Sequence, residues 1–214
     1  SREPMSANER REREKQERRE SILDSAEQCF FSKGYERTAM DEIARGAQLS
    51  RALLYVYFKD KAAIMRGLML RAGQQLLTRF QAAQTAGGSG LEQLQRIGWS
   101  YYQFSVEAPD YFDLLTDAST FSHLVDSDEQ LQELASCYDQ SMACMIQSLT
   151  DGVADGSLHP ERVADPVLTA CYLRGALHGV ILQTRQPDPC EQPQMPAEQL
   201  IGYTLQMLNH SMRA

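Results

Sequence analysis

Apolar residues recur at intervals of three and four along most of the 214 residues of this chain, which is the spacing of one helical face. The longest such run consists of Leu131, Leu134, Ala135, Tyr138, Met142, Met145, Ile146, Leu149 and Val153. Ser127 with Gln130 predicts a capping box at its start, and Gly156 predicts its end. This run indicates one long amphipathic helix.

A second apolar stripe extends over residues 94–108 and stops before Pro109, because the residue that precedes a proline disfavours the helical conformation. Between the two stripes, the sequence YFDLLTDASTF is too irregular to assign. The chain contains no Asn-Gly turn and no convincing alternation of apolar and polar residues between turn residues. The pattern therefore predicts an all-α fold.

Two C-terminal segments carry more apolar surface than one small domain can cover. Residues 163–185 are apolar on most sides, and Gly175 and Gly179 would allow another helix to approach closely. Residues 197–212 carry two neighbouring apolar stripes. We expect these helices from two subunits to form a four-helix dimer interface; the alternative is that they complete a monomer core. The candidate interface residues are Tyr172, Arg174, Gly175, His178, Gly179, Leu182, Tyr203 and Met207.

The N-terminal part begins with a charged run that leads into an amphipathic helix. Ile22, Ala26 and Phe30 share one face of this helix, and Gly34 is placed to end it. The charges upstream have mixed signs, and their spacing supports a solvated helical extension. A basic arm that reaches along DNA is the alternative reading of this extension.

Two short helical patterns follow around a turn. Thr38 with Asp41 predicts a capping box for the first pattern, MDEIARGA. Ser50 predicts the N-cap of the second pattern, in which Leu54 and Phe58 lie on the buried side. A pair of short helices of this kind is typical of a helix-turn-helix motif.

The remaining surface of the second short helix has a particular order. It carries Arg51, Ala52, Leu53, Tyr55 and Tyr57. Small residues at its start let the helix end approach the floor of a groove, whereas tyrosine hydroxyls and arginine can bond phosphates or base edges. This order is typical of a recognition helix.

Charge is distributed unevenly between the two parts of the chain. The formal net charge is -8, but residues 1–70 hold 14 Lys and Arg against 12 Asp and Glu, a net of +2, and the remaining residues hold 7 against 17, a net of -10. All the lysines fall in the first part. Cationic surface is therefore concentrated where a polyanion such as DNA can use it.

The N-terminal pattern resembles the tetracycline-repressor (TetR) family of helix-turn-helix regulators. The resemblance rests on Thr38, Ile43, Ala44, Ala47, Leu49, Ser50, Leu54, Tyr55, Tyr57, Phe58 and Lys61, preceded by a helix that ends in FFSKGYER. It implies an N-terminal extension over residues 1–17, a three-helix DNA-binding domain over residues 18–66, and a larger helical domain for ligand binding and dimerisation over residues 67–214.

The resemblance also implies which residues meet double-stranded DNA. Thr38, Tyr55, Tyr57 and Lys61 would contact the DNA backbone, with Arg45 as a further candidate for a phosphate contact. Residues 50–55, which include Ser50, Arg51, Ala52 and Leu53, would face the major groove of a palindromic operator.

Three positions depart from the family pattern. Gln48 stands in the turn where the family commonly has glycine, and it must tolerate the turn geometry at a cost of about 1 kcal/mol if its φ is positive. Ala52 and Leu53 stand where the family often has glycine and threonine. Because Leu53 cannot donate a hydrogen bond but can pack on a thymine methyl, the operator preference of the family cannot be transferred.

Aromatic and methionine residues of the acidic part could line a cavity for a small apolar or aromatic effector. The candidates are Trp99, Tyr102, Phe104, Tyr111, Phe112, Phe121, Tyr138, Met142 and Met145, and a filled core is the alternative. Arg174 lies within an apolar segment and needs a partner, either an acid across the dimer or an anionic ligand.

Other chemistry finds little support in the sequence. No GxSxG, GxGxxG, P-loop or HExxH motif occurs, so we expect neither an enzyme nor a cofactor. Cys171 and His178 share a helical face, but two ligands do not make a metal site. Five cysteines without a CxxC pair, and no apolar run of about 18 residues, favour a reduced cytoplasmic protein without a membrane span.

These observations favour a dimeric, ligand-responsive transcriptional regulator, most often a repressor in a family of this kind. The alternative is a constitutive helical interaction protein that uses the helix-turn-helix as a scaffold. Specific binding to palindromic DNA distinguishes the two.

Overall fold

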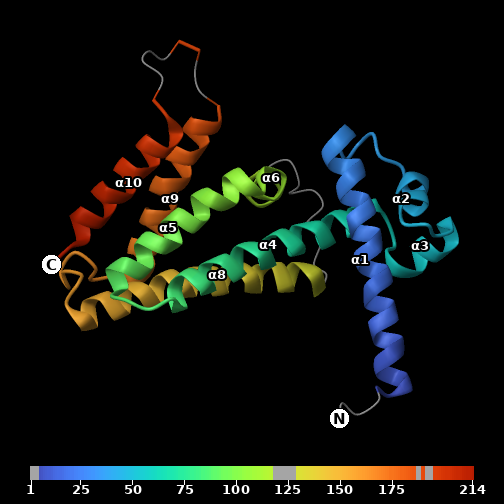
Figure 1. Cartoon of the computed structure of the whole chain (residues 1–214), viewed down its shortest axis with the longest axis horizontal. Helices are drawn as coiled ribbons and strands as arrows, with labels where there is room; N and C mark the ends of the chain where they lie inside the picture. Colours follow the sequence, from blue (N-terminus) through green and yellow to red (C-terminus); the bar gives the residue numbers. More distant parts are fainter. Residues whose placement is uncertain (1–4, 118–128, 187–188, 191–194) are drawn as a thin grey trace. The chain divides into compact units, whose positions relative to one another are not determined.

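The structure is a computed structural model that describes residues 5–117, 129–186, 189–190 and 195–214. Phe121 and Ser127 lie outside the described residues, so the expected capping box at Ser127 and the cavity position of Phe121 are not addressed. Helices account for almost all of the regular structure in the described part (Figure 1). The chain forms two compact units, one containing the residues up to Arg71 and the other containing Ala72–Thr116 and Gln132–Ala214.

The first unit contains three helices and the beginning of a fourth. They are α1 (Ala7–Lys33), α2 (Met40–Gly46), α3 (Arg51–Tyr57) and α4 (Lys61–Thr85), which continues into the second unit. Their buried apolar side chains include Ile22, Ala26, Phe30, Ile43, Leu54, Phe58 and Ile64. Gly34 ends α1 at a φ of 93°, as its position after the apolar stripe predicts.

The start of α2 differs from the sequence prediction by one residue. The N-cap is Ala39, whose backbone N–H donates to Oε2 of Glu42 at 3.3 Å. The Thr38 hydroxyl instead donates to the carbonyl of Gly34 at 2.8 Å, and the side chain of Thr38 is buried. The predicted capping box of Thr38 and Asp41 is therefore wrong, because the Thr38 hydroxyl is used in closing the end of α1.

The second unit is a bundle of helices. After the end of α4 come α5 (Gly90–Glu107), α6 (Pro109–Thr116), α8 (Glu129–Asp155), α9 (Pro166–Arg185) and α10 (Ala197–Met212). The segment YFDLLTDASTF, which is irregular in sequence, contributes the end of α6. Its apolar residues Phe112 and Leu114 are buried.

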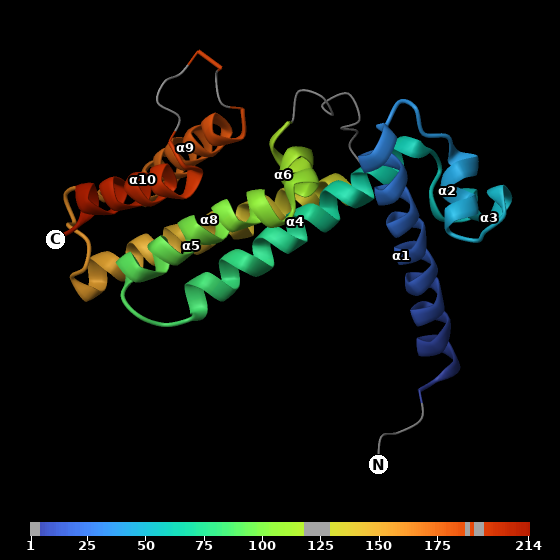
Figure 2. The same cartoon turned by 45° about the horizontal axis from the view of Figure 1, so that its top comes forward.

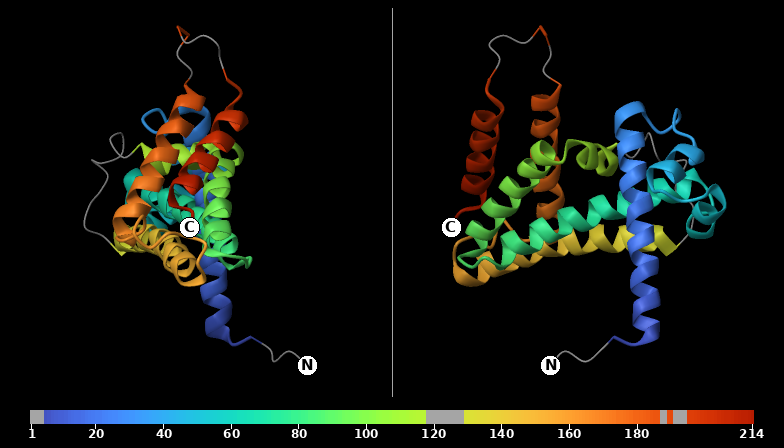
Figure 3. Two further views of the ribbon diagram at one scale, coloured as in Figure 1. Left: turned by 90° about the vertical axis from the view of Figure 1, so that its left-hand side faces the viewer. Right: turned by 45° about the vertical axis from the view of Figure 1, so that its right-hand side comes forward.

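The helices of this bundle run close together. Figure 2 shows α4, α5 and α8 side by side, and Figure 3 shows α9 and α10 as an adjacent pair. At the start of α5, a Cβ on Gly90 would lie 2.1 Å from the backbone nitrogen of Gly152, so only glycine permits this approach to α8. Gly156, at a φ of 82°, follows the end of α8 as the sequence predicts.

All five cysteines are free thiols. Cys137 and Cys144 are buried on α8, Cys29 is half-buried, and Cys171 and Cys190 are exposed. Burial raises the pKa of the Cys137 and Cys144 thiols above the ordinary value. Among the described helices, none is long and apolar enough to cross a membrane.

Candidate DNA-binding surface and effector cavity

The connection between α2 and α3 is a tight turn. Gln48 adopts a φ of 57°, in the left-handed region, and the N–H of Leu49 donates to the carbonyl of Ala44 at 2.9 Å. The Ser50 hydroxyl then accepts from the N–H of Leu53 at 3.1 Å and begins α3 as its N-cap. The turn geometry expected from the sequence is thus present, although a glutamine occupies the position that favours glycine.

α1 holds this pair of helices from behind. A Cβ on Gly46 would lie 2.2 Å from Oγ of Ser25, so α1 and α2 are in close contact at this point. The same hydroxyl donates to the carbonyl of Ile43 at 2.8 Å. Leu54 is fully buried and secures α3 to this support. The orientation of α3 is therefore fixed within its unit by packing and by a buried hydrogen bond.

The outward side of α3 presents mainly apolar and aromatic surface. Arg51 and Ala52 are exposed, Tyr55 is 41% exposed, and Leu53 and Tyr57 are half-buried. Val56 is 77% exposed and did not figure among the candidates from sequence, although its position between the two tyrosines is the signal that identifies it. α3 thus carries one more residue able to meet a thymine methyl.

The guanidinium group of Arg51 on α3 already has partners within the protein. The Arg51 guanidinium lies 3.3 Å from a carboxylate oxygen of Asp41 on α2 and 5.7 Å from the ring centre of Tyr55. Both groups of the ion pair are well exposed, so water weakens their attraction and a DNA phosphate can replace Asp41 at small cost. Arg45, also exposed, lies near the end of α2.

Lys61 has a structural role that the sequence did not indicate. Its ammonium group donates to the carbonyls of Tyr35 at 2.8 Å and Thr38 at 3.2 Å, and it lies 4.4 Å from the ring centre of Tyr35. A third carbonyl, that of Glu36, lies at 3.5 Å. Since an ammonium group has three donors, Lys61 can bond all three carbonyls and so hold the loop between α1 and α2, while its contact with the DNA backbone stays a prediction.

The bundle contains a small interior cavity of about 40 Å³. It is lined by Phe80, Leu94, Ile97, Gly98, Tyr101, Met145, Leu173, Arg174, Leu177, Leu205, Leu208 and Asn209. Of the predicted cavity residues that the structure describes, only Met145 lies here. Phe104 and Phe112 are fully buried, with ring centres 6.4 Å apart, and they fill the core instead.

The other aromatic candidates lie elsewhere in the bundle. Tyr102 is buried with its ring centre 6.0 Å from that of Trp99, and Met142 is buried. Tyr111 is half-buried. The cavity depends on residues from five helices, so the spacing along any one helix could not identify its lining.

Tyr101 and His178 form a polar contact at this cavity. The Tyr101 hydroxyl lies 2.8 Å from Nδ1 of His178. Burial, together with the guanidinium groups of Arg174 and Arg185, lowers the pKa of His178 below its ordinary value. The imidazole is therefore held neutral near pH 7, with Nδ1 placed to accept from the tyrosine.

Arg174 has a partner within its own unit. Its guanidinium donates to the hydroxyl of Tyr138, which is itself exposed, and lies 5.0 Å from that ring centre. Arg174 is exposed rather than enclosed in an apolar segment, because the buried side of α9 is formed by residues such as Leu173 and Leu177. Pairing of Arg174 with an acid across the dimer, or with an anionic ligand, stays a prediction.

An apolar face remains exposed on α9 and α10. We call it the α9/α10 face, and it comprises Leu168, Tyr172, Gly175, Gly179, Leu182, Tyr203 and Met207. Leu168 is 69% exposed and Tyr203 is 61% exposed. A Cβ on either glycine would meet nothing within 4 Å. His178, a further interface candidate, turns toward Tyr101 and is not part of this face.

The short helix, left-handed turn and second short helix with its outward aromatic surface define a helix-turn-helix DNA-binding protein. Residues 22–68 match the family model described as bacterial regulatory proteins of the tetR family. Residues 22–68 therefore form a DNA-binding domain of the kind found in tetR-family transcriptional regulators.

Related proteins agree with this assignment. The chain is 25% identical over 167 residues to the HTH-type transcriptional repressor Rv1474c of Mycobacterium tuberculosis, covering 77% of this chain and 80% of that protein. It is 26% identical over 98 residues to the uncharacterised regulator YuxN of Bacillus subtilis, covering 46% of this chain but only 34% of YuxN. The crystal structure of a TetR/AcrR-family regulator from Thermobifida fusca has the same fold, with a TM-score of 0.70, 23% identity, and coverage of 92% of this chain and 100% of that one.

Proposed function

We propose that this protein is a cytoplasmic, homodimeric repressor that leaves a palindromic operator when a small apolar or aromatic molecule binds its second unit. The observation that carries the DNA-binding part is the outward surface of α3. Ala52 and Leu53 come first, where the helix end would meet base edges, and Tyr55, Val56 and Tyr57 follow. This order suits insertion of the N-terminal end of α3 into the major groove.

The contacts to DNA divide into two kinds. Arg45 and Arg51 are exposed cations that would meet phosphates, and the hydroxyls of Tyr55 and Tyr57 would bond the backbone beside them. Leu53 would read sequence through a thymine methyl, since it offers no hydrogen bond. Thr38 and Lys61 would act indirectly, by fixing the loop before α2.

The α9/α10 face supports dimerisation. An apolar surface of this kind, with glycines that leave room for a second helix, is suited to pairing with a second copy of itself about a twofold axis. In such a dimer, the two α3 helices would bind in successive major grooves of the DNA. This arrangement requires an operator with two related half-sites.

The interior cavity supports the effector role. Its lining is apolar except for Tyr101, Arg174 and Asn209. A volume of about 40 Å³ is smaller than a drug-sized ligand requires, so an effector would have to displace flexible side chains such as Met145. A ligand that favours this expanded state would shift the population away from the DNA-binding state.

Selection of bound sequences from random duplex DNA tests the proposal directly. We expect a palindrome with two half-sites. The Leu53→Thr variant should change the preferred base at one position in each half-site, with a change of about 1–3 kcal/mol in the binding free energy difference between the bases there. Gln28→Ala, on the exposed side of α1, is the matched control and should select the wild-type sequence. A wild-type protein without preference for any palindrome would instead support the constitutive interaction protein.

Calorimetry tests the effector role. If a ligand of the interior cavity lowers the affinity for the selected operator, then the operator must lower the affinity for that ligand by the same factor. Equal ligand affinity with and without operator DNA would show that the cavity does not control DNA binding.

A further inference from the structure

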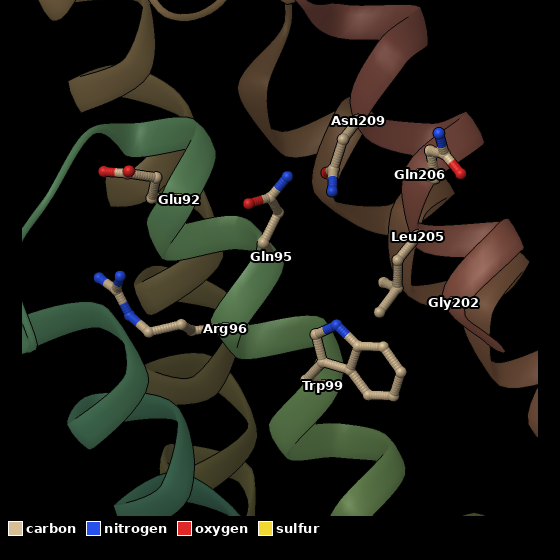
Figure 4. A pocket seen from close by; sticks show the side chains of 8 residues that line it. All are labelled: Glu92, Gln95, Arg96, Trp99, Gly202, Leu205, Gln206 and Asn209. Carbon is tan, nitrogen blue, oxygen red and sulfur yellow. The ribbon is translucent and has the colours of Figure 1, made fainter. Parts of the chain in front are cut away.

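A groove of about 450 Å³ lies on the surface of the second unit between α5 and α10. Its lining consists of Glu92, Gln95, Arg96, Trp99, Gly202, Leu205, Gln206 and Asn209. Figure 4 shows Gln95 and Trp99 on α5 facing Leu205 and Asn209 on α10 across this space. The groove therefore combines an aromatic surface with three carboxamide groups, those of Gln95, Gln206 and Asn209.

Asn209 is the unusual member of this set. Only 8% of Asn209 is exposed, and within the described part of the chain its carboxamide makes no side-chain hydrogen bond. Its polar atoms are not among the fully enclosed ones without a partner, so they can be reached from the groove. A carboxamide that reaches solvent and has no partner within the protein bonds water, which a ligand can replace. Its carboxamide points into the groove and is therefore placed to bond a molecule bound there.

The charged residues at the end of the groove already form hydrogen bonds within the protein. Glu92 accepts from the backbone N–H of Ser89 at 2.7 Å, and Nε of Arg96 donates to the carbonyl of Ala83 at 2.8 Å. They carry opposite charges and their side chains point away from Asn209 in Figure 4. The groove therefore favours an uncharged ligand.

We propose that the α5–α10 groove binds a flat, uncharged aromatic molecule that carries an amide or lactam. The Asn209 carboxamide presents an N–H donor beside a carbonyl acceptor, which matches the N–H and C=O of a lactam in a pair of hydrogen bonds. Trp99, 38% exposed, offers an indole ring for stacking. A Cβ on Gly202 would lie 3.8 Å from this ring, so the glycine keeps the space above it open.

This site is separate from the α9/α10 face and adjoins the interior cavity. At about 100° per residue along α10, Gly202, Leu205 and Asn209 lie on the side away from Tyr203 and Met207. A dimer that forms through Tyr203 and Met207 leaves the groove accessible. Leu205 and Asn209 also line the interior cavity, so a ligand in the groove touches two residues that the cavity shares. The inference does not depend on the proposed repressor function.

The test uses 2-quinolinone as the lactam probe and its N-methyl derivative as the probe without a donor. Calorimetry with the full chain measures both affinities. Fluorescence assigns the site, because Trp99 is the single tryptophan of the chain and lines the groove but not the interior cavity.

The variants are Asn209→Leu, which removes the carboxamide, and Gly202→Leu, which fills the groove. Gln81→Leu, at an exposed carboxamide on α4, is the control.

We expect 2-quinolinone to bind the wild type and Gln81→Leu with equal affinity and to change the Trp99 emission. The N-methyl derivative, or the Asn209→Leu variant, should bind at least about tenfold more weakly, the loss expected for a buried hydrogen-bonded pair. Gly202→Leu should abolish the response of Trp99. The proposal is overturned if 2-quinolinone gives neither heat nor a change in emission up to its solubility limit, or if Gly202→Leu binds it as the wild type does.

Discussion

Gln48 stores backbone strain at the centre of the DNA-binding unit. Its φ of 57° is the only positive value among the non-glycine residues that the structure describes. We expect Gln48→Gly to raise the free energy of unfolding of this unit by about 1 kcal/mol, because glycine adopts this conformation without a steric cost. Chemical denaturation measures the change.

The control for this substitution is Gln28→Gly. Gln28 is exposed in the interior of α1, where glycine should lower the free energy of unfolding by about 1 kcal/mol. The same chemical change should therefore have opposite signs at the two positions. If both substitutions destabilised the protein, the glutamine side chain would stabilise the turn by more than the positive φ of Gln48 destabilises it.

His178 gives the second unit a pH dependence of known sign. Its pKa is lowered in the folded protein from an ordinary value of 6.5, so below that pH the unfolded chain binds the proton more readily. We expect the free energy of unfolding to decrease as the pH falls from 7 to 5. Urea denaturation of wild type and His178→Gln should show a smaller decrease in the variant, whereas His210→Gln, at an exposed histidine, should keep the wild-type dependence.

At the scale of elements, the loop between α1 and α2 depends on α4. Because the Lys61 ammonium satisfies carbonyls of that loop, we expect Lys61→Ala to lower the free energy of unfolding by about 1–3 kcal/mol. DNA affinity should then decrease for all sequences alike. Arg45→Ala should leave the free energy of unfolding nearly unchanged. It should reduce the magnitude of the slope of the logarithm of the DNA-binding constant against the logarithm of salt concentration by about 1 per contacting subunit.

Denaturation followed by DNA titration at several salt concentrations separates the two variants. If Lys61→Ala were fully stable and reduced the salt dependence like Arg45→Ala, the ammonium group would be a phosphate contact after all. The carbonyl bonds would then have to break when DNA binds.

The helix-turn-helix could be predicted from the sequence because its signals are local. The Ser50 cap, the buried spacing of Leu54 and Phe58, and the strained turn at Gln48 each involve residues only a few positions apart. The sequence does not predict the role of Thr38, because its hydroxyl could reach either the start of α2 or the carbonyl of Gly34, and spacing cannot distinguish the two.

The cavity and the groove could not be predicted in the same way. Tyr101 and Tyr102 are neighbours in an apolar stripe, and only the packing of other helices decides that Tyr101 lines the cavity. Asn209 follows the apolar positions of α10 as an ordinary polar residue, and its burial depends on α5. Sites formed between helices require the tertiary arrangement, which periodicity along one helix does not contain.

For the whole molecule, association through the α9/α10 face is the central expectation. We expect a dimer at micromolar concentration, and we expect Gly179→Asp to dissociate it, because an unpaired charge in a close helix contact is strongly unfavourable. Sedimentation measures the molecular mass. Ala143→Asp, at an exposed small residue on α8, is the control and should remain dimeric. A monomeric wild type would remove the basis for a palindromic operator.

The cysteine distribution makes this association measurable by chemical labelling. Cys171 is exposed on α9 beside Tyr172, Cys190 is exposed outside the helices, and the buried Cys137 and Cys144 have raised pKa values that slow their reaction. If two copies cover α9, alkylation of Cys171 must wait for dissociation, so its rate should decrease as the protein concentration rises. Cys190 should react at a rate that is independent of concentration, and the ratio of the two rates would report the fraction of protein that is monomeric.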